Sequence, residues 1–216
     1  MGANPLWKID FHCHSEYSRD SRSKIRDLIL RAKDIGLDRL VLTDHNTIRG
    51  ALAARELEPD FVIAGEEILT TRGELLAFFV EREVPKGLPP EAAIDFLRAQ
   101  GAFISVSHPF DLNRHGWHQS DLDIIRPMVD AIEVFNARCL LHGTNHQAAA
   151  YAARHGLAGT AGSDAHLVGE VGKAVTVLAP FDSAETLRKA LPAATIEARY
   201  SSLWVHLGST LAKFGR

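Results

Sequence analysis

The chain has 216 residues, of which 46% are hydrophobic and 24% charged, a composition that suits one globular domain with a sizeable core. A formal net charge of −3 argues against the basic surfaces that bind long nucleic acids or anionic membranes. The two cysteines, Cys13 and Cys139, are too few and too far apart for a disulfide framework or a cysteine-type zinc site. The start of the chain lacks a signal-peptide layout and no apolar run reaches spanning length, so we expect a cytoplasmic protein with no membrane partner.

The hydrophobic pattern predicts an alternation of short strands and helices. A first strand runs into residues 9–15, and it is followed by helix 24–35, strand 39–43, helix 47–57, strands 61–64 and 75–80, helix 90–100, strands 103–106 and 131–135, helix 145–155, strands 157–161 and 174–178, and helix 183–191. This order predicts βα units and a mostly parallel sheet. An open doubly wound sheet has the same alternation, but no Gly-x-Gly-x-x-Gly follows the first strand. We therefore predict a single-domain α/β barrel.

Residues able to bind metal follow strand after strand. His12 and His14 share one face of the first strand end with Asp10, because alternate side chains of a strand point the same way. A lone histidine is more often a surface or hydrogen-bonded residue, but the recurrence at successive strand ends favours a common site. The candidate ligands are His12, His14, Asp20, His45, Glu67, His108, Asp164 and His166. Imidazoles and carboxylates without thiolates suit zinc, manganese or iron.

The motifs that carry these residues resemble those of the PHP family, named for polymerase and histidinol phosphatase domains. They lie in the family's order between residues 10 and 166: Asp10-Phe11-His12-Cys13-His14, Thr43-Asp44-His45, Gly65-Glu66-Glu67, Ser107-His108-Pro109 and Gly162-Ser163-Asp164-Ala165-His166. The resemblance implies a distorted (β/α)7 barrel with a site for two or three divalent metal ions.

The resemblance also implies how the ligands divide among the ions. One metal would be bound by His12, His14, Glu67 and Asp164, and Glu67 would bridge to a second metal that also takes His108. A third metal would be bound by Asp20, His45 and His166.

Two positions depart from the family pattern. Glu74 stands where many relatives have a histidine ligand of the second metal, and Asp20 stands where some relatives have a histidine. We include both as candidate ligands. Glu66 is expected on the surface or just behind the ligands, and Asp10 and Asp44 are expected to orient histidines rather than bind metal.

The implied activity is that of a metal-dependent phosphoesterase, a hydrolase that uses metal-activated water on a phosphate ester. We assign catalytic roles to Asp164 and to His45 and His166, the latter two as candidate proton donors. Arg138 is a candidate phosphate clamp, although it could equally pair with an acid at the barrel rim, and Asn136 is expected to point toward the substrate.

Two further segments have alternative interpretations. The polar and aromatic loop 113–118 suits a specificity loop, or else an exposed linker with Trp117 folded onto the core. Residues 200–216 carry apolar residues near helical spacing and are expected to pack back on the domain, with a dimer contact as the alternative. The histidines left outside the expected site are His142, His146, His155 and His206.

The expected substrate is a small phosphorylated metabolite or nucleotide. Alternatives are trimming of oligonucleotides by phosphodiester hydrolysis, phosphotyrosine hydrolysis, and a non-catalytic, metal-stabilised binding module. The near-complete ligand set argues against the last of these, because a structural metal does not need an open multi-metal site.

Overall fold

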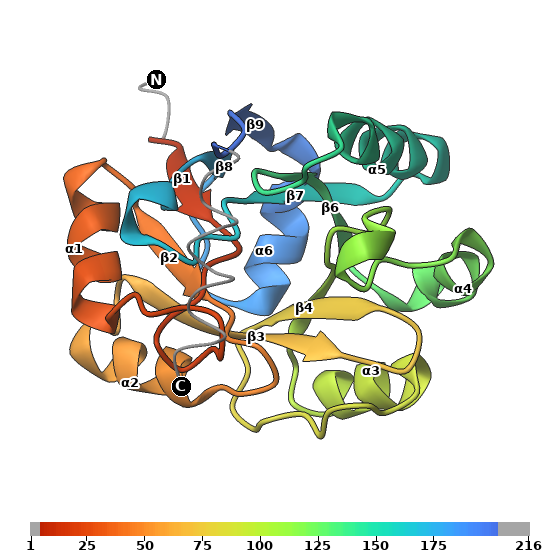
Figure 1. Cartoon of the computed structure of the whole chain (residues 1–216), viewed down its shortest axis with the longest axis horizontal. Coiled ribbons are helices and arrows are strands. Elements are labelled where there is room, and N and C mark those ends of the chain that lie inside the picture. Colours follow the sequence, from red (N-terminus) through yellow and green to blue (C-terminus); the bar gives the residue numbers. More distant parts are fainter. Residues whose placement is uncertain (1–4, 203–216) are drawn as a thin grey trace.

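The computed structural model describes residues 5–202 as a mixed α/β domain (Figure 1). The strands are β1 (Trp7–Asp10), β2 (Arg39–Leu42), β3 (Val62–Leu69), β4 (Glu74–Phe78), β5 (Phe103–Val106), β6 (Ala131–Asn136), β7 (Ala158–Gly162), β8 (Ala174–Leu178) and β9 (Thr195–Ala198). The α-helices are α1 (Ile25–Asp34), α2 (Arg49–Leu57), α3 (Pro90–Arg98), α4 (Gln119–Ile125), α5 (His142–His155) and α6 (Ala184–Ala190).

The strands form a nearly closed barrel. The sheet has the order β7-β6-β5-β4-β3-β2-β1-β8-β9, so β1 to β7 are neighbours in chain order. The loop after β7 then returns to the chain after β1, where Asp164 N donates to His12 O over 2.7 Å and His14 N donates to Ala165 O over 2.9 Å. This confirms the predicted seven-stranded barrel, which β8 and β9 extend along the other side of β1.

The sheet is not mostly parallel, as the alternation of elements suggested. Antiparallel pairs join β3 to β4, β4 to β5, β1 to β8 and β8 to β9. Only a tight turn separates β3 from β4, in which Thr70 N donates to Gly73 O, and a turn without a crossover helix must reverse the chain. The reversal brings the first residue of β4, Glu74, to the edge of the barrel where β1 and β2 end.

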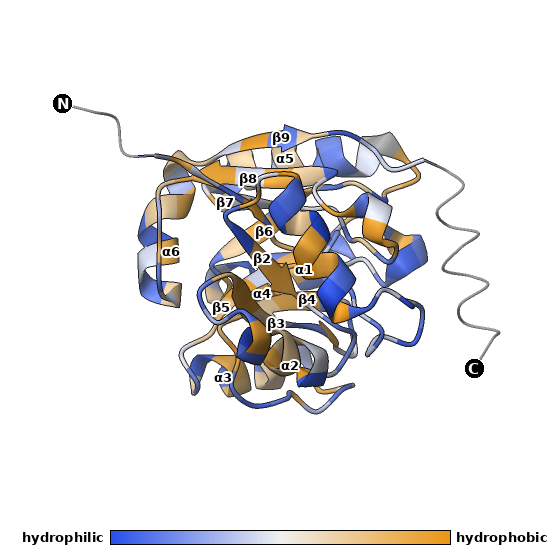
Figure 2. Ribbon diagram, turned by 90° about the vertical axis from the view of Figure 1, so that its left-hand side faces the viewer, coloured by the Kyte–Doolittle hydropathy of each residue, from blue (hydrophilic) through white to orange (hydrophobic). Residues whose placement is uncertain are grey.

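The core explains why these segments adopt these structures. Helix α1 buries Ile25, Leu28, Ile29 and Ala32, the spacing that predicted it, and Figure 2 shows the central strands coloured predominantly as hydrophobic. Inside the barrel, the ring of Phe78 lies 5.1 Å from Phe11 and 5.6 Å from Phe103, measured between centroids. These rings share one apolar cluster with Ala184 and Leu187 of α6, and the polar site lies outside this cluster.

Some elements differ from the sequence-based expectations. Helix α4 and strand β9 were not predicted, and β3 continues through Glu66 and Glu67 instead of ending before them. Within residues 5–202, no helix combines the length and the apolar character needed to cross a membrane. The expected packing concerned residues 200–216, and of these residues 203–216 lie outside the described part. Just before them, the ring of Tyr200 lies 4.9 Å from that of Phe135 on β6.

Candidate metal centre

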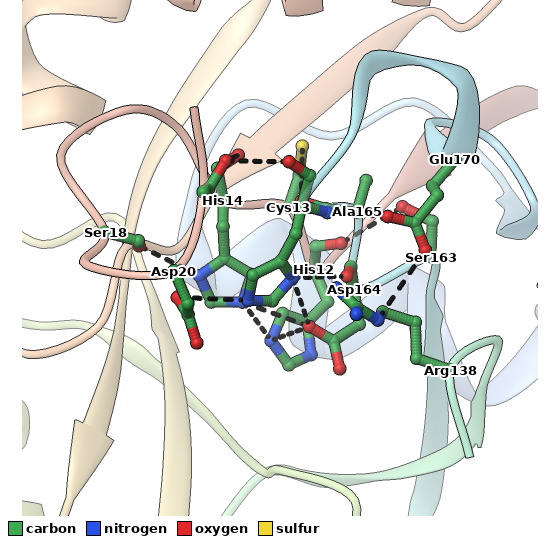
Figure 3. A network of polar contacts seen from close by, with 12 residues as sticks. His12, Cys13, His14, Ser18, Asp20, Arg138, Ser163, Asp164, Ala165 and Glu170 are labelled. Carbon is green, nitrogen blue, oxygen red and sulfur yellow. Dashed lines mark hydrogen bonds and ion pairs between the residues drawn. The ribbon is translucent and has the colours of Figure 1, made fainter. Parts of the chain in front are cut away.

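Four side chains that could bind a metal meet at the end of β1 (Figure 3 labels three of them, His12, His14 and Asp164). His12 Nε2 lies 2.9 Å from His14 Nε2, 3.2 Å from Glu67 Oε2 and 3.6 Å from Asp164 Oδ1. His14 Nε2 lies 3.3 Å from the same Glu67 oxygen and 3.2 Å from the same Asp164 oxygen. Ligands about 2.0–2.1 Å from a tetrahedral zinc ion would stand roughly 3.3 Å apart, which is close to these distances. His12, His14 and Asp164 are near enough to one another to share one ion, and Glu67 lies beside them.

The backbone is shaped to bring these groups together. Gly162 has no side chain, and a Cβ there would stand only 2.2 Å from the Cβ of His12. Two residues on, Asp164 has a left-handed backbone with φ 53°, which is uncommon for a residue other than glycine. The motif Gly162-Ser163-Asp164 therefore lets β7 approach β1 closely and turns the Asp164 carboxylate back toward the histidines.

Glu67 faces a second group of candidate ligands with its other oxygen. Its Oε1 lies 3.1 Å from His108 Nε2 and accepts a hydrogen bond from Ser107 Oγ over 2.7 Å. Glu74 Oε2 lies 3.4 Å from the same His108 nitrogen. Glu74 can also bind an ion together with His45 and Glu67. Bridging by Glu67 and the division of ligands between ions both stay predictions.

The remaining candidates lie on the open side of the cluster. Asp20 Oδ1 lies 3.2 Å from His166 Nε2 and 3.6 Å from His45 Nε2. Nitrogen atoms of His14, His45 and His166 are also close enough to share one ion. The structure thus brings together all nine residues that the sequence analysis named as ligands.

Burial and mutual charge perturb these groups strongly. Burial and the nearby His166 and His45 lower the pKa of His14 to about 3. Burial also lowers the pKa of His45, but the carboxylates of Glu67 and Asp20 outweigh it and raise the value to about 10. Burial and the charge of Glu67 raise the pKa of Glu74 to about 7. Ionisable groups packed this densely are costly to bury unless a cation compensates the carboxylates, which is the role the donor set fits.

Comparisons with known proteins agree with this geometry. The model of the PHP domain matches residues 10–97, and the model of the PHP-associated region matches residues 142–196. An uncharacterized protein of Methanocaldococcus jannaschii, MJ1587, is 37% identical over 145 residues, which cover 60% of this chain and 82% of that protein. The chain belongs to the PHP family.

Solved structures share the fold of this PHP protein. PsfC from Pseudomonas syringae PB-5123 has a TM-score of 0.72 at 19% identity, covering 97% of this chain and 98% of PsfC. A Bifidobacterium adolescentis protein, provisionally described as a metal-dependent phosphoesterase, has a TM-score of 0.64 at 19% identity, covering 94% and 100%. The lesion-specific endonuclease PfuEndoQ from Pyrococcus furiosus has a TM-score of 0.66 at 17% identity, and this chain matches 57% of its length.

The acidic residues beside the PHP motifs act mainly on loops. Asp10 accepts hydrogen bonds from Ser163 N and Gly172 N, each over 2.9 Å, and from His12 N over 3.3 Å, so it contacts the backbone of His12 and not its ring. Asp44 reaches a histidine only indirectly. It accepts a 2.6 Å hydrogen bond from Ser18 Oγ, and that hydroxyl lies 3.2 Å from His14 Nδ1.

Glu66 is not a surface residue. It is fully buried, and its Oε2 accepts a 3.0 Å hydrogen bond from Val84 N. Burial raises the pKa of Glu66 to about 8, so the side chain is largely protonated at neutral pH. A neutral Glu66 can occupy the apolar surroundings of β3 while its neighbour Glu67 serves the site.

Of the two candidate substrate residues, Arg138 borders the cavity beside the metal centre and Asn136 does not. This cavity of about 1160 Å³ is lined by seven of the nine candidate ligands, all but His12 and His14, and by Arg114 and Arg138. Arg138 is buried, and its Nε lies 3.6 Å from Glu170 Oε1, so it pairs with an acid and also reaches the cavity. Asn136 bonds within the protein, donating to Glu133 and Asp164 over 3.1 Å each. Direct contact of Arg138 or Asn136 with substrate stays a prediction.

The loop 113–118 combines a buried tryptophan with polar residues beside the cavity, and its role in specificity stays a prediction. Trp117 is buried in the core and donates from Nε1 to Glu74 O over 3.0 Å. Asn113, Arg114 and His115 border the cavity, and Arg114 forms an ion pair with Asp164.

Two residues of this site were not identified from the sequence. One is Arg114, which pairs with Asp164, and the other is Glu133 on β6. Glu133 lies 3.0 Å from His12 Nδ1. The only signal for Glu133 was one charged residue within the apolar run Ala131-Ile132-Glu133-Val134-Phe135.

Proposed function

We propose that this PHP protein is a cytoplasmic hydrolase that cleaves a phosphate ester in a small phosphorylated metabolite or nucleotide with the help of two or three divalent ions. The observation that carries the proposal is the position of Glu67. Its two carboxylate oxygens face different groups of histidines, His12, His14 and His45 on one side and His108 on the other. A purely structural ion would not need a carboxylate shared in this way.

Bound divalent ions would supply water of lowered pKa as a nucleophile and would neutralise charge on the phosphoryl oxygens. The protein's own task is to hold the phosphate in place, since phosphoryl transfer depends mainly on positioning and electrostatic stabilisation. Arg138 and Arg114 border the cavity on the side of Asp164, where their guanidinium groups can orient phosphoryl oxygens.

A proton must also reach the leaving oxygen of the ester. His45 is a candidate donor because it lies on the cavity and is only partly buried, with a side-chain exposure of 27%. The imidazole could act in this way only when it is not itself bound to a metal ion. His166 is the alternative donor, at the same mouth of the cavity.

The test is hydrolysis of an aryl phosphate by protein loaded separately with zinc, manganese or iron, followed by a panel of sugar phosphates, nucleotides and phosphopeptides. We expect activity that disappears on treatment with a chelator and returns with metal. Glu67→Gln protein serves as the control for contaminating phosphatases. Absence of hydrolysis with every metal and substrate would contradict the proposal and favour a binding module.

A second candidate is a phosphodiesterase that acts on short oligonucleotides. The favouring observation is that the cavity is also bordered by Arg19, Arg49 and Lys86, in addition to Arg114 and Arg138. Cations spaced along a groove suit successive phosphates of a single strand. The shared fold with PfuEndoQ, a lesion-specific endonuclease, is consistent with this candidate. Short single-stranded oligonucleotides without terminal phosphates would distinguish it in the same panel. Such a substrate gives product only if an internal phosphodiester bond is cleaved, which a phosphomonoesterase does not do.

A further inference from the structure

Glu133 is a buried carboxylate on β6 that uses both of its oxygens within the site. It is 1% exposed, and its Oε1 lies 3.0 Å from His12 Nδ1. Its Oε2 accepts hydrogen bonds from His108 N over 2.9 Å and from Asn136 Nδ2 over 3.1 Å. Glu133 therefore contacts the ring of one candidate ligand and the backbone of another.

The contact with His12 decides which ring nitrogen can bind an ion. A carboxylate only accepts hydrogen bonds, so the proton of a neutral His12 ring must lie on Nδ1. The lone pair is then on Nε2, the atom that faces Glu67 and Asp164 at 3.2 Å and 3.6 Å. The carboxylate also increases the basicity of the ring, which strengthens its bond to a metal.

The second oxygen acts on the other half of the centre. By accepting from His108 N, it fixes the start of the loop after β5, where His108 turns toward Glu67 and Glu74. Asn136, held by the same oxygen, donates in turn to Asp164 Oδ2 over 3.1 Å. One carboxylate thus supports ligands on both sides of the Glu67 bridge.

We propose that Glu133 is a positioning residue that sets the tautomer of His12 and couples metal binding on the two sides of Glu67. The inference rests on the metal centre of the proposed function, but it is independent of the substrate. Glutamine cannot replace Glu133, because an amide has a single acceptor oxygen while His12 and His108 need one each. With the amide oxygen toward His12, the contact with His108 N is lost. With the oxygen toward His108, the amide N–H faces His12 Nδ1, which can accept it only if the ring proton moves to Nε2, the atom needed for the metal.

The experiment measures zinc affinity by competition with a chromogenic chelator, using protein first stripped of metal. We expect Glu133→Gln to weaken binding roughly 10- to 100-fold, the range for loss of a carboxylate that supports a histidine ligand. The matched control is Glu66→Gln, another fully buried glutamate, whose only hydrogen bond to Val84 N an amide can keep. It should bind zinc as the wild type does.

Two further measurements separate positioning from a general structural role. Thermal unfolding of the metal-free variants reports any loss of fold stability, and the visible spectrum of cobalt-loaded protein reports the ligand geometry, which we expect to change only in Glu133→Gln. If Glu133→Gln does not fold, the zinc-loaded wild type still decides. NMR should then show a proton on His12 Nδ1, and a proton on Nε2 would overturn the proposal.

The outcomes distinguish this inference from the proposed function. A wild type that binds no zinc overturns the metal centre and the present proposal together. A wild type that binds zinc, with unchanged affinity and an unchanged cobalt spectrum in Glu133→Gln, overturns the role of Glu133 alone, even if the variant unfolds at a lower temperature.

Discussion

Replacing Glu67 with glutamine tests whether one carboxylate serves two ions. In the structure Oε2 lies 3.2 Å from His12 Nε2 and 3.0 Å from His45 Nδ1, and Oε1 lies 3.1 Å from His108 Nε2. The amide of glutamine has one neutral oxygen in place of one carboxylate oxygen and an NH2 group in place of the other. The ion facing the NH2 group would lose a ligand, and the ion facing the oxygen would lose the negative charge of its ligand. Each loss removes a charge-assisted contact of about 1.5–3 kcal/mol, or roughly 10- to 150-fold. Because both fall on the same centre, we expect kcat/KM to drop by roughly 100-fold or more.

The assay is steady-state hydrolysis of the best substrate, with the metal content of each variant measured in parallel. Glu66→Gln is the matched control, because Glu66 is largely neutral at pH 7, with a pKa raised to about 8 by burial, and an amide resembles its protonated form. It should keep most of the activity. Full activity of Glu67→Gln, or loss of activity in Glu66→Gln instead, would refute the bridging position of Glu67.

Three other expectations can be checked with the same protein. Metal analysis after reconstitution should give two or three ions per chain, and one ion or fewer would contradict the multi-metal centre. Arg138→Ala should raise KM by roughly 10- to 150-fold with little change in kcat, and Arg138→Lys should recover only part of this, whereas an unchanged kcat/KM would leave the arginine without a substrate role. Asp130→Asn should destabilise the metal-free protein by about 1.5–3 kcal/mol at pH 7, since Asp130 accepts hydrogen bonds of 2.8–3.0 Å from Arg98 and Arg188. Burial raises the pKa of Asp130, but the hydrogen bonds from Arg98 and Arg188 outweigh burial and hold the folded-state pKa below the ordinary 3.8. The stabilisation is therefore fully present above pH 3.8 and is lost as the pH falls through the folded-state pKa. Urea unfolding at pH 7 and pH 3 should therefore show a smaller difference between wild type and variant at the lower pH.

The position of the site was predictable because of a simple property of parallel strands. When β1, β2 and β3 run side by side in the same direction, the residues that end them meet at one edge. His12, His45 and Glu67 therefore converge although the chain separates them by whole βα units. Their residue types, not merely their places, indicated a metal centre, because imidazoles and carboxylates are rarely buried together without a cation.

The position of Glu74 followed less directly. A family pattern placed it among the ligands, but the expectation of a mostly parallel sheet would put the start of a strand at the far end of the barrel. The antiparallel pairing of Leu69 with Glu74 resolves this, since a reversed strand begins where its neighbours finish.

Glu133 and Arg114 could not be found by the same reasoning, since neither belongs to a recurring motif with an obvious ligand type. What identifies them is a tertiary contact, with His12 Nδ1 for Glu133 and with Asp164 for Arg114. Periodicity predicts which face of a strand is buried but not which buried polar group it will meet. A charged residue in an otherwise apolar strand still indicates that a partner must exist, because an unpaired buried carboxylate costs several kcal/mol. For a barrel with a metal centre, the partner to look for first is the ring nitrogen that a histidine ligand does not use for its metal.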